Sequence, residues 1–187
     1  MNSSLIYKLR NKVKVQPRAE TLIVICALLG AIGFNLWQLF PETTGGTMTG
    51  ADSLFHLLLA ESAVDAITHG RDITDPWQSM SLGFPVFHHY QHLPHVALAL
   101  IHIASFEVFP LIDMMRWSTY LLISLFPLSI FWSLRLFSFE PLTCAMGAVL
   151  ASLIGNDFQL FGGFGYVNYV VDGFGLYTQL WGMVLLP

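Results

Sequence analysis

The feature that most constrains this chain is the run TLIVICALLGAIGFNLWQLF, residues 21–40, which contains no charged side chain. A helix of about 20 apolar residues is long enough to cross the hydrocarbon layer of a bilayer. Trp37 lies near the far end of the run, where aromatic rings favour the membrane interface. The alternative is a cleaved signal peptide, but the apolar core of such a peptide is usually about 7 to 15 residues long. We therefore predict transmembrane helix 1 at residues 21–40.

The composition favours a membrane protein over a soluble domain. Hydrophobic residues make up 55% of the 187 residues and charged residues 11%, whereas about a quarter of the residues in a soluble domain are charged. Basic side chains that flank a transmembrane helix usually stay in the cytoplasm. Those that precede the run predict a cytoplasmic tail at residues 1–20: Lys8, Arg10, Lys12, Lys14 and Arg18. The expected partner is therefore the lipid bilayer, and nucleic acid is not expected to bind.

Residues 41–112 are expected to form an external loop that holds two helices alongside the membrane. The first of these helices is predicted at residues 52–69. Asp52 is placed to act as its N-cap, and Gly70 is placed to end it. The helix is amphipathic, so we expect it to lie beside the bilayer and not to cross it.

The second helix of this loop is predicted at residues 95–109. It is short for a membrane span and carries His95, His102 and Glu107, so we expect it to lie in the outer interface. His95 and His102 share one face, which would look toward water or lipid headgroups. If this helix crossed the bilayer instead, Arg135 would lie outside, against the usual preference of positive charges for the cytoplasm.

The remaining apolar segments predict a polytopic, all-α membrane protein. Asp113 and Arg116, three residues apart near the start of the next apolar run, could form a local ion pair. Because the last apolar stretch is only about fourteen residues long, we expect the chain to be an N-terminal fragment of a longer protein. The expected segments are transmembrane helix 2 at residues 113–134, transmembrane helix 3 at 141–155, an external loop at 156–173, and the start of transmembrane helix 4 at 174–187.

Titratable side chains concentrate in the external loop, which is therefore the expected working surface. Asp52 and His56 would lie one helical turn apart and point the same way. The carboxylate could bind a divalent metal or take a proton from an acceptor hydroxyl. Alternatively, Asp52 only caps the helix and His56 is an interface residue. Every histidine of the chain falls in this loop: His56, His69, His88, His89, His92, His95 and His102.

Other catalytic and metal-binding patterns are weak. The stretch HHYQH, residues 88–92, together with His95 could supply imidazoles to a transition metal, but its spacing matches no strong zinc signature. The chain contains no Walker loop, dinucleotide fingerprint, nucleophile elbow or paired-cysteine zinc site. We therefore do not expect the usual chemistry of soluble enzymes.

The order of these segments resembles the C-type, polyprenyl-phosphate-dependent glycosyltransferases. The stretch ADSLFHLLLAESAVDAITHGRDITDPWQSMSLGFPVFHHYQHLP is similar to the version in membrane proteins labelled 6-pyruvoyl-tetrahydropterin synthase-related, and GLYTQLWGMVLLP is similar to the opening of one of their later spans. The chain departs from the superfamily where Asp52-Ser53 replaces an Asp-Glu pair. The matching positions are Asp52, His56, Gly70, Pro76, Trp77, Gly83, Pro85, Tyr90 and Pro94.

The resemblance implies an N-terminal glycosyltransferase-like module in the plasma membrane of a bacterium or archaeon. Its expected partner is a polyprenyl-phosphate sugar, transferred to an acceptor on the outer face. The cofactor stays open, with Mg²⁺ or Mn²⁺ as candidates. Non-catalytic assembly of envelope polysaccharide and, less favoured, transport are the alternatives. The implied catalytic residues are Asp52, His56 and Asp157, and the implied substrate-binding residues are Arg71, Trp77, His88, His89 and Tyr90.

Overall fold

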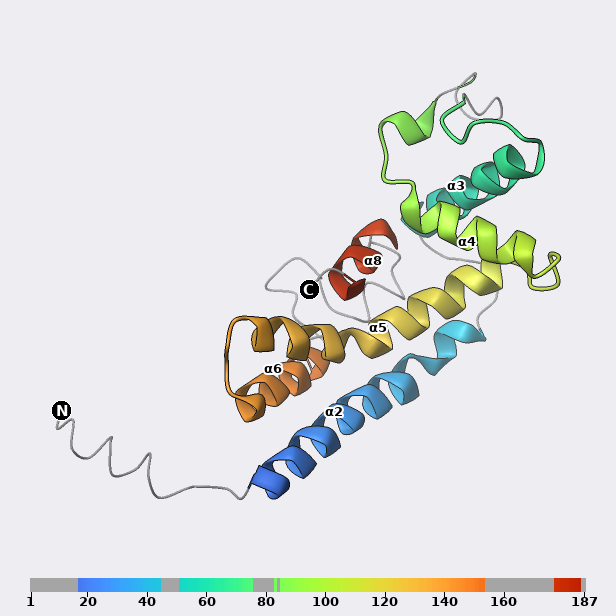
Figure 1. The fold of residues 1–187 in the computed structure, drawn as a ribbon. Helices are drawn as coiled ribbons and strands as arrows, with labels where there is room; N and C mark the ends of the chain where they lie inside the picture. The colour runs from blue at the N-terminus through green and yellow to red at the C-terminus, as the bar shows by residue number, and fades with distance from the viewer. Residues whose placement is uncertain (1–16, 45–50, 76–82, 84, 154–176, 186–187) are drawn as a thin grey trace.

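A computed structural model of the chain describes residues 17–44, 51–75, 83, 85–153 and 177–185. All regular secondary structure in these residues is helical, which confirms the predicted all-α class (Figure 1). The elements in chain order are α2 (Pro17–Leu39), the 3-10 turn η1 (Phe40–Thr43), α3 (Ala51–Thr68), the 3-10 turn η2 (Val86–His88), α4 (Leu93–Ala104), α5 (Leu111–Leu136), α6 (Pro141–Leu153) and α8 (Tyr177–Leu185).

The two longest helices, α2 and α5, lie side by side and run in opposite directions (Figure 1). Tyr120 near the start of α5 donates its hydroxyl hydrogen to the carbonyl oxygen of Leu36 near the end of α2, at 2.9 Å. The start of α2 and the end of α5 therefore share one end of the pair. Arg135, near the end of α5, therefore lies toward the same end of the pair as the start of α2.

Both helices are long and apolar enough to cross a membrane, by length and composition. They also expose large apolar side chains on their outer faces, where an ordinary soluble domain would carry polar groups. Pro127 inside α5 is buried against its neighbours. The exposed apolar residues of α2 and α5 include Leu22, Ile25, Leu29, Trp37, Trp117, Leu121, Leu125, Leu128 and Trp132.

Helices α6 and α8 complete the bundle around α5. Helix α6 packs on both α2 and α5, while α8 lies along α5. Ser118 and Tyr177 share a hydrogen bond of 2.7 Å between their hydroxyls, and Ser129 donates to the carbonyl oxygen of Val184 at 2.5 Å. Because both partners advance along the chain together, α8 runs parallel to α5.

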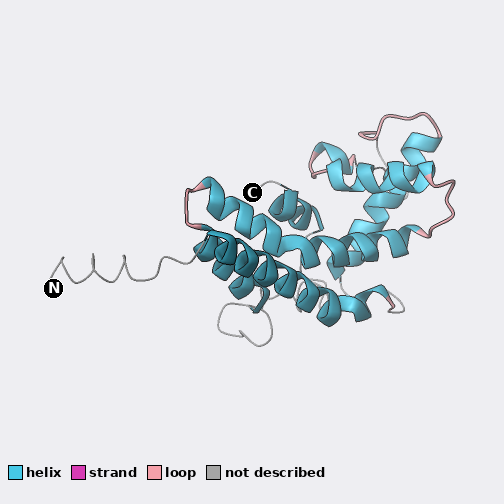
Figure 2. Cartoon of the chain, turned by 60° about the horizontal axis from the view of Figure 1, so that its bottom comes forward, coloured by secondary structure: helices cyan, strands magenta, loops and turns pink. Residues whose placement is uncertain are grey.

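Helices α3 and α4 form a separate small layer at one end of the α2–α5 pair, near the end of α2 and the start of α5 (Figures 1 and 2). Leu59 and Ala63 of α3 are fully buried against Ala99 of α4, with Val86 and Phe87 of η2 closing the same apolar cluster. Two short helices are thus present between residues 41 and 112, the segment in which two were predicted. The side of the membrane on which they lie remains a prediction.

The ends of α3 follow from its sequence with one correction. Gly70 adopts a left-handed φ of +64°, and the amide of Arg71 donates back to the carbonyl oxygen of Ala66 at 2.8 Å. Only glycine takes this conformation without strain, so the predicted stop at Gly70 is confirmed. Asp52, however, lies inside the first turn of a helix that starts at Ala51, so it is not the N-cap that we predicted.

Helix α4 starts and ends before the predicted 95–109, at Leu93 and Ala104. Phe106 and Glu107 have left-handed φ angles of 54° and 59°, which are rare for residues with a side chain and which end the helix. Beyond them, Pro110 precedes α5. Near the start of α5, the predicted pair is present: Arg116 and Asp113 are joined by a contact of 3.9 Å.

Replacing Gly147 with leucine is expected to lower the free energy of unfolding by about 1–3 kcal/mol, because the site is already filled. A Cβ atom on Gly147 of α6 would lie 2.6 Å from Cδ1 of Leu134 on α5. A Cβ atom on Gly30 of α2 meets nothing within 4 Å, so Gly30→Leu is the matched control and is expected to cause no loss. Thermal unfolding in detergent would measure both, and equal losses would contradict close packing at Gly147.

Candidate functional site

The most ordered polar feature of the described chain is a line of hydrogen bonds that joins α3, α4 and α8. It runs from the backbone amide of Tyr177 through His56 and His95 to the carbonyl oxygen of Gln91. The three distances are 3.1 Å from the amide to Nε2 of His56, 3.0 Å from Nδ1 of His56 to Nε2 of His95, and 3.2 Å from Nδ1 of His95 to the Gln91 oxygen. We call these four groups the histidine relay.

The two ends of the histidine relay fix where its protons lie. A backbone amide can only donate and a carbonyl oxygen can only accept. Nε2 of His56 must therefore accept from Tyr177, which places the hydrogen of His56 on Nδ1. By the same reasoning Nε2 of His95 accepts from His56, and Nδ1 of His95 carries the hydrogen given to Gln91. Both rings are thus neutral, and each ring nitrogen has one partner.

Burial accounts for the neutral state of both rings. His56 and His95 each have 0% of their surface exposed. Desolvation lowers the pKa of His56 from 6.5 to about 4, while the negative charge of Asp52 acts in the opposite direction. Desolvation is also the main reason that the pKa of His95 is lowered to about 4. The positive charge of a protonated His56 lowers it further, whereas the hydrogen bond to Gln91 raises it.

Aromatic rings surround the histidine relay on several sides. The ring of Tyr90 lies 5.9 Å from His56 and meets Phe55 edge-on, with 5.7 Å between their centroids. The ring of Tyr177 lies 5.9 Å from both histidines. The hydroxyl oxygen of Tyr90 is buried and has no hydrogen-bond partner within the described part of the chain.

Asp52 lies next to the histidine relay, in the first turn of α3 and one turn before His56. Its side chain is partly exposed, and its charge reaches His56. A carboxylate with access to solvent can accept a proton from a hydroxyl group. His56 is fully buried, and both of its ring nitrogens are hydrogen-bonded. In this arrangement neither nitrogen is open to a substrate, and the catalytic role of His56 stays a prediction.

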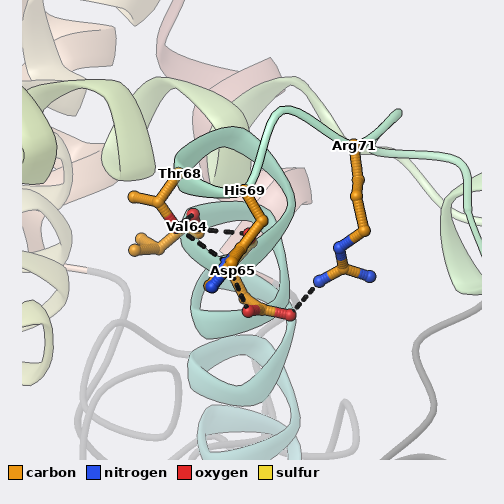
Figure 3. A network of polar contacts seen from close by, with 5 residues as sticks. All are labelled: Val64, Asp65, Thr68, His69 and Arg71. Carbon is orange, nitrogen blue, oxygen red and sulfur yellow. Dashed lines mark hydrogen bonds and ion pairs between the residues drawn. The ribbon is translucent and has the colours of Figure 1, made fainter.

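Arg71, predicted to bind substrate, is held at the other end of α3. Its guanidinium forms an ion pair with Asp65, which also accepts from His69 (Figure 3). Asp65 lies thirteen residues after Asp52, so the two carboxylates are separated by roughly 20 Å along the helix axis at about 1.5 Å per residue. The described structure therefore does not bring Arg71 together with Asp52.

We expect Arg71→Gln to lower the free energy of unfolding by no more than about 1 kcal/mol. Arg71 and Asp65 expose 36% and 42% of their side chains, so water competes with the ion pair. Thermal unfolding in detergent at low and high salt would measure the effect, which salt should reduce further. A loss that is large and independent of salt would show that Arg71 has a structural role beyond this surface pair.

The other predicted site residues that the structure describes lie in two places. His88 and His89 lie exposed at the end of η2, while Tyr90 lies beside the histidine relay. Trp77 and Asp157 lie outside the described residues. Within the described ranges, no three His, Cys, Asp or Glu side chains come close enough to hold a metal ion. The cofactor therefore stays open, with Mg²⁺ or Mn²⁺ as the candidates that the resemblance suggests.

Sequence reasoning found only His56 among the four groups of the histidine relay and missed, among the others, His95 and the amide of Tyr177. His95 was expected to face water or headgroups, yet it is fully buried, which corrects that interpretation. A signal was present, because His95, Leu98 and Ala99 follow the i, i+3, i+4 spacing of a buried helix face. Tyr177 had no local signal, since it lies 121 residues after His56.

Comparison with known proteins adds no relative: no protein-family profile, no curated protein and no solved structure matches this chain.

Proposed function

We propose that this chain acts as a membrane glycosyltransferase, which moves a sugar from a polyprenyl-phosphate donor to an acceptor at the outer membrane surface. The observation that carries the proposal is the position of Asp52. It is a partly exposed carboxylate in the first turn of α3, at the end of the apolar α2–α5 pair, in the layer where titratable side chains collect.

A site at the end of two apolar helices suits a lipid-linked donor. The polyprenyl tail partitions among acyl chains, whereas the phosphate and sugar stay at the level of the headgroups. If α2 and α5 cross the bilayer, then α3 and α4 lie at that level. Asp52 would then be within reach of the bond between the sugar and the phosphate. A donor that is soluble in water, such as a sugar nucleotide, would not need a site at the membrane surface.

The proposed reaction requires a base for the acceptor. The acceptor hydroxyl attacks the anomeric carbon of the sugar, and Asp52 takes the hydroxyl proton as the new carbon–oxygen bond forms. The polyprenyl phosphate departs with the electrons of the broken bond. The hydrogen bond between buried His56 and His95 joins the second turn of α3 to the first turn of α4 and so helps to fix the position of the carboxylate one turn before His56.

A donor panel tests the proposal. Membranes that contain the protein would be supplied with radiolabelled polyprenyl-phosphate sugars, one sugar at a time, and with acceptors extracted from the same cells. Transfer to a product that depends on both the protein and a lipid-linked donor is the expected result. The proposal fails if the folded protein transfers none of the panel, and transfer from sugar nucleotides in place of lipid donors would also contradict it.

A further inference from the structure

We propose that His56 and His95 form an acid-operated latch, which holds the N-terminus of α8 on α3 and α4 while both rings are neutral. One added proton opens it. The inference concerns a conformational change, does not depend on the proposed enzymatic activity, and follows from how the histidine relay is built. We refer to the state with all three hydrogen bonds intact as the closed form.

The two rings of the closed form carry one proton each, and there is no place for a further proton on either ring. The three hydrogen bonds of the closed form use the Tyr177 amide hydrogen and the Nδ1 hydrogens of His56 and His95. If His56 gains a proton, its Nε2–H points at the Tyr177 N–H, and two donors face each other. If His95 gains a proton, its Nε2–H points at the Nδ1–H of His56. Moving the His56 hydrogen to Nε2 only transfers the conflict to Tyr177.

The bond to Tyr177 is the one whose loss would be visible. Tyr177 is the first residue of α8, and its amide is one of the groups that a helix start leaves without a partner inside the helix. His56 supplies the missing acceptor. Apart from this bond, the described contacts of Tyr177 are the Ser118 hydroxyl and the neighbouring aromatic rings and apolar side chains. A protonated His56 would therefore break this polar contact, so that apolar packing on Leu57, Ala60 and Leu98 would be left to hold the first turn of α8 on α3 and α4.

The surroundings of the histidine relay set the direction of its response to pH. Asp52 on α3 favours a charge on His56, whereas His92 before α4 disfavours a charge on His95. Tyr90 and Tyr177 contact His56 with their uncharged rings. The positive charge of Arg116 on α5 is paired with the negative charge of Asp113. The pKa of both histidines is lowered to about 4, so burial outweighs the attraction of Asp52.

The sign of the effect follows from these values. Between pH 6.5 and about 4 the open form binds more protons than the closed form, because its solvated histidines keep their ordinary pKa. The closed form is thus fully stable above pH 6.5 and loses stability as the pH falls. For each histidine that becomes solvated, the equilibrium constant for opening rises about 30-fold between pH 8 and pH 5.

Amide hydrogen exchange of the full chain in detergent, followed by mass spectrometry, tests the latch. After correction for the intrinsic pH dependence, protection of the α8 peptide should fall by about 30-fold or more between pH 8 and pH 5, whereas α2 should stay unchanged. Protection of α8 that does not depend on pH would overturn the proposal. So would an equal loss in α2, because it would indicate general unfolding.

Two further measurements keep the proposal testable. A double variant, His56→Gln with His95→Gln, keeps donors and acceptors but cannot take up a proton, so its α8 should show no acid response. If that variant does not fold, nitrogen NMR of the wild-type protein with ¹⁵N-labelled histidine shows which ring nitrogen of His56 and of His95 carries the hydrogen. Two rings should carry hydrogen on Nδ1 at neutral pH and stay neutral below pH 6. Finding either ring with hydrogen on Nε2 would contradict the latch.

Discussion

Replacing His95 with alanine is expected to lower the free energy of unfolding by about 3–5 kcal/mol. The change empties a fully buried site between α3 and α4 and leaves Nδ1–H of His56 without an acceptor. A cavity and a buried unpaired donor each add to the cost, and an unpaired buried group alone costs about 1–3 kcal/mol. Chemical or thermal unfolding of the purified protein in detergent would measure the loss.

His88→Ala is the matched control for His95→Ala, because His88 is an exposed histidine seven residues earlier. We expect its effect to stay within about 0.5 kcal/mol. A double-mutant cycle between His56 and His95 should give a coupling free energy of about 0.5–3 kcal/mol, since the two rings share a hydrogen bond. If His95→Ala were as mild as His88→Ala, the buried position of His95 would be wrong.

The helices could be predicted from the sequence wherever local chemistry decides their limits. Gly70 ends α3 because its left-handed φ suits glycine, and Pro141 starts α6 because proline lacks an amide hydrogen that the first turn does not need. The end of α4 was predicted five residues late. Phe106 and Glu107 have left-handed φ angles that their side chains do not signal.

The candidate site was predicted only in its local part. Asp52 and His56 lie one turn apart on α3, and that spacing was visible in the sequence. The burial of His56 depends on His95 and Tyr177, which reach it through the packing of α4 and α8. Contacts between residues so far apart in the chain have no local pattern. The sequence therefore did not show that both ring nitrogens of His56 are hydrogen-bonded.

Asp52→Asn is expected to reduce sugar transfer by about 10²- to 10⁴-fold, if the proposed base is correct. Asparagine keeps the size and the place of the side chain in the first turn of α3 but cannot take a proton from the acceptor. The rate of transfer in membranes, divided by the amount of folded protein, measures the effect. Glu61→Gln is the matched control, because Glu61 is an exposed carboxylate on the same helix and should be replaceable without loss.

Folding and chemistry can be separated in the Asp52→Asn variant. The charge of Asp52 raises the pKa of His56, so its removal should lower that pKa further and leave the histidine relay intact at neutral pH. Stability above pH 6.5 should then match that of the wild-type protein while transfer is lost. If both variants transfer sugar as well as the wild-type protein does, Asp52 is not the base. If Asp52→Asn also unfolds at neutral pH, the side chain of Asp52 has a structural role in the first turn of α3. The loss of sugar transfer would then be explained by the lost stability of the layer formed by α3 and α4.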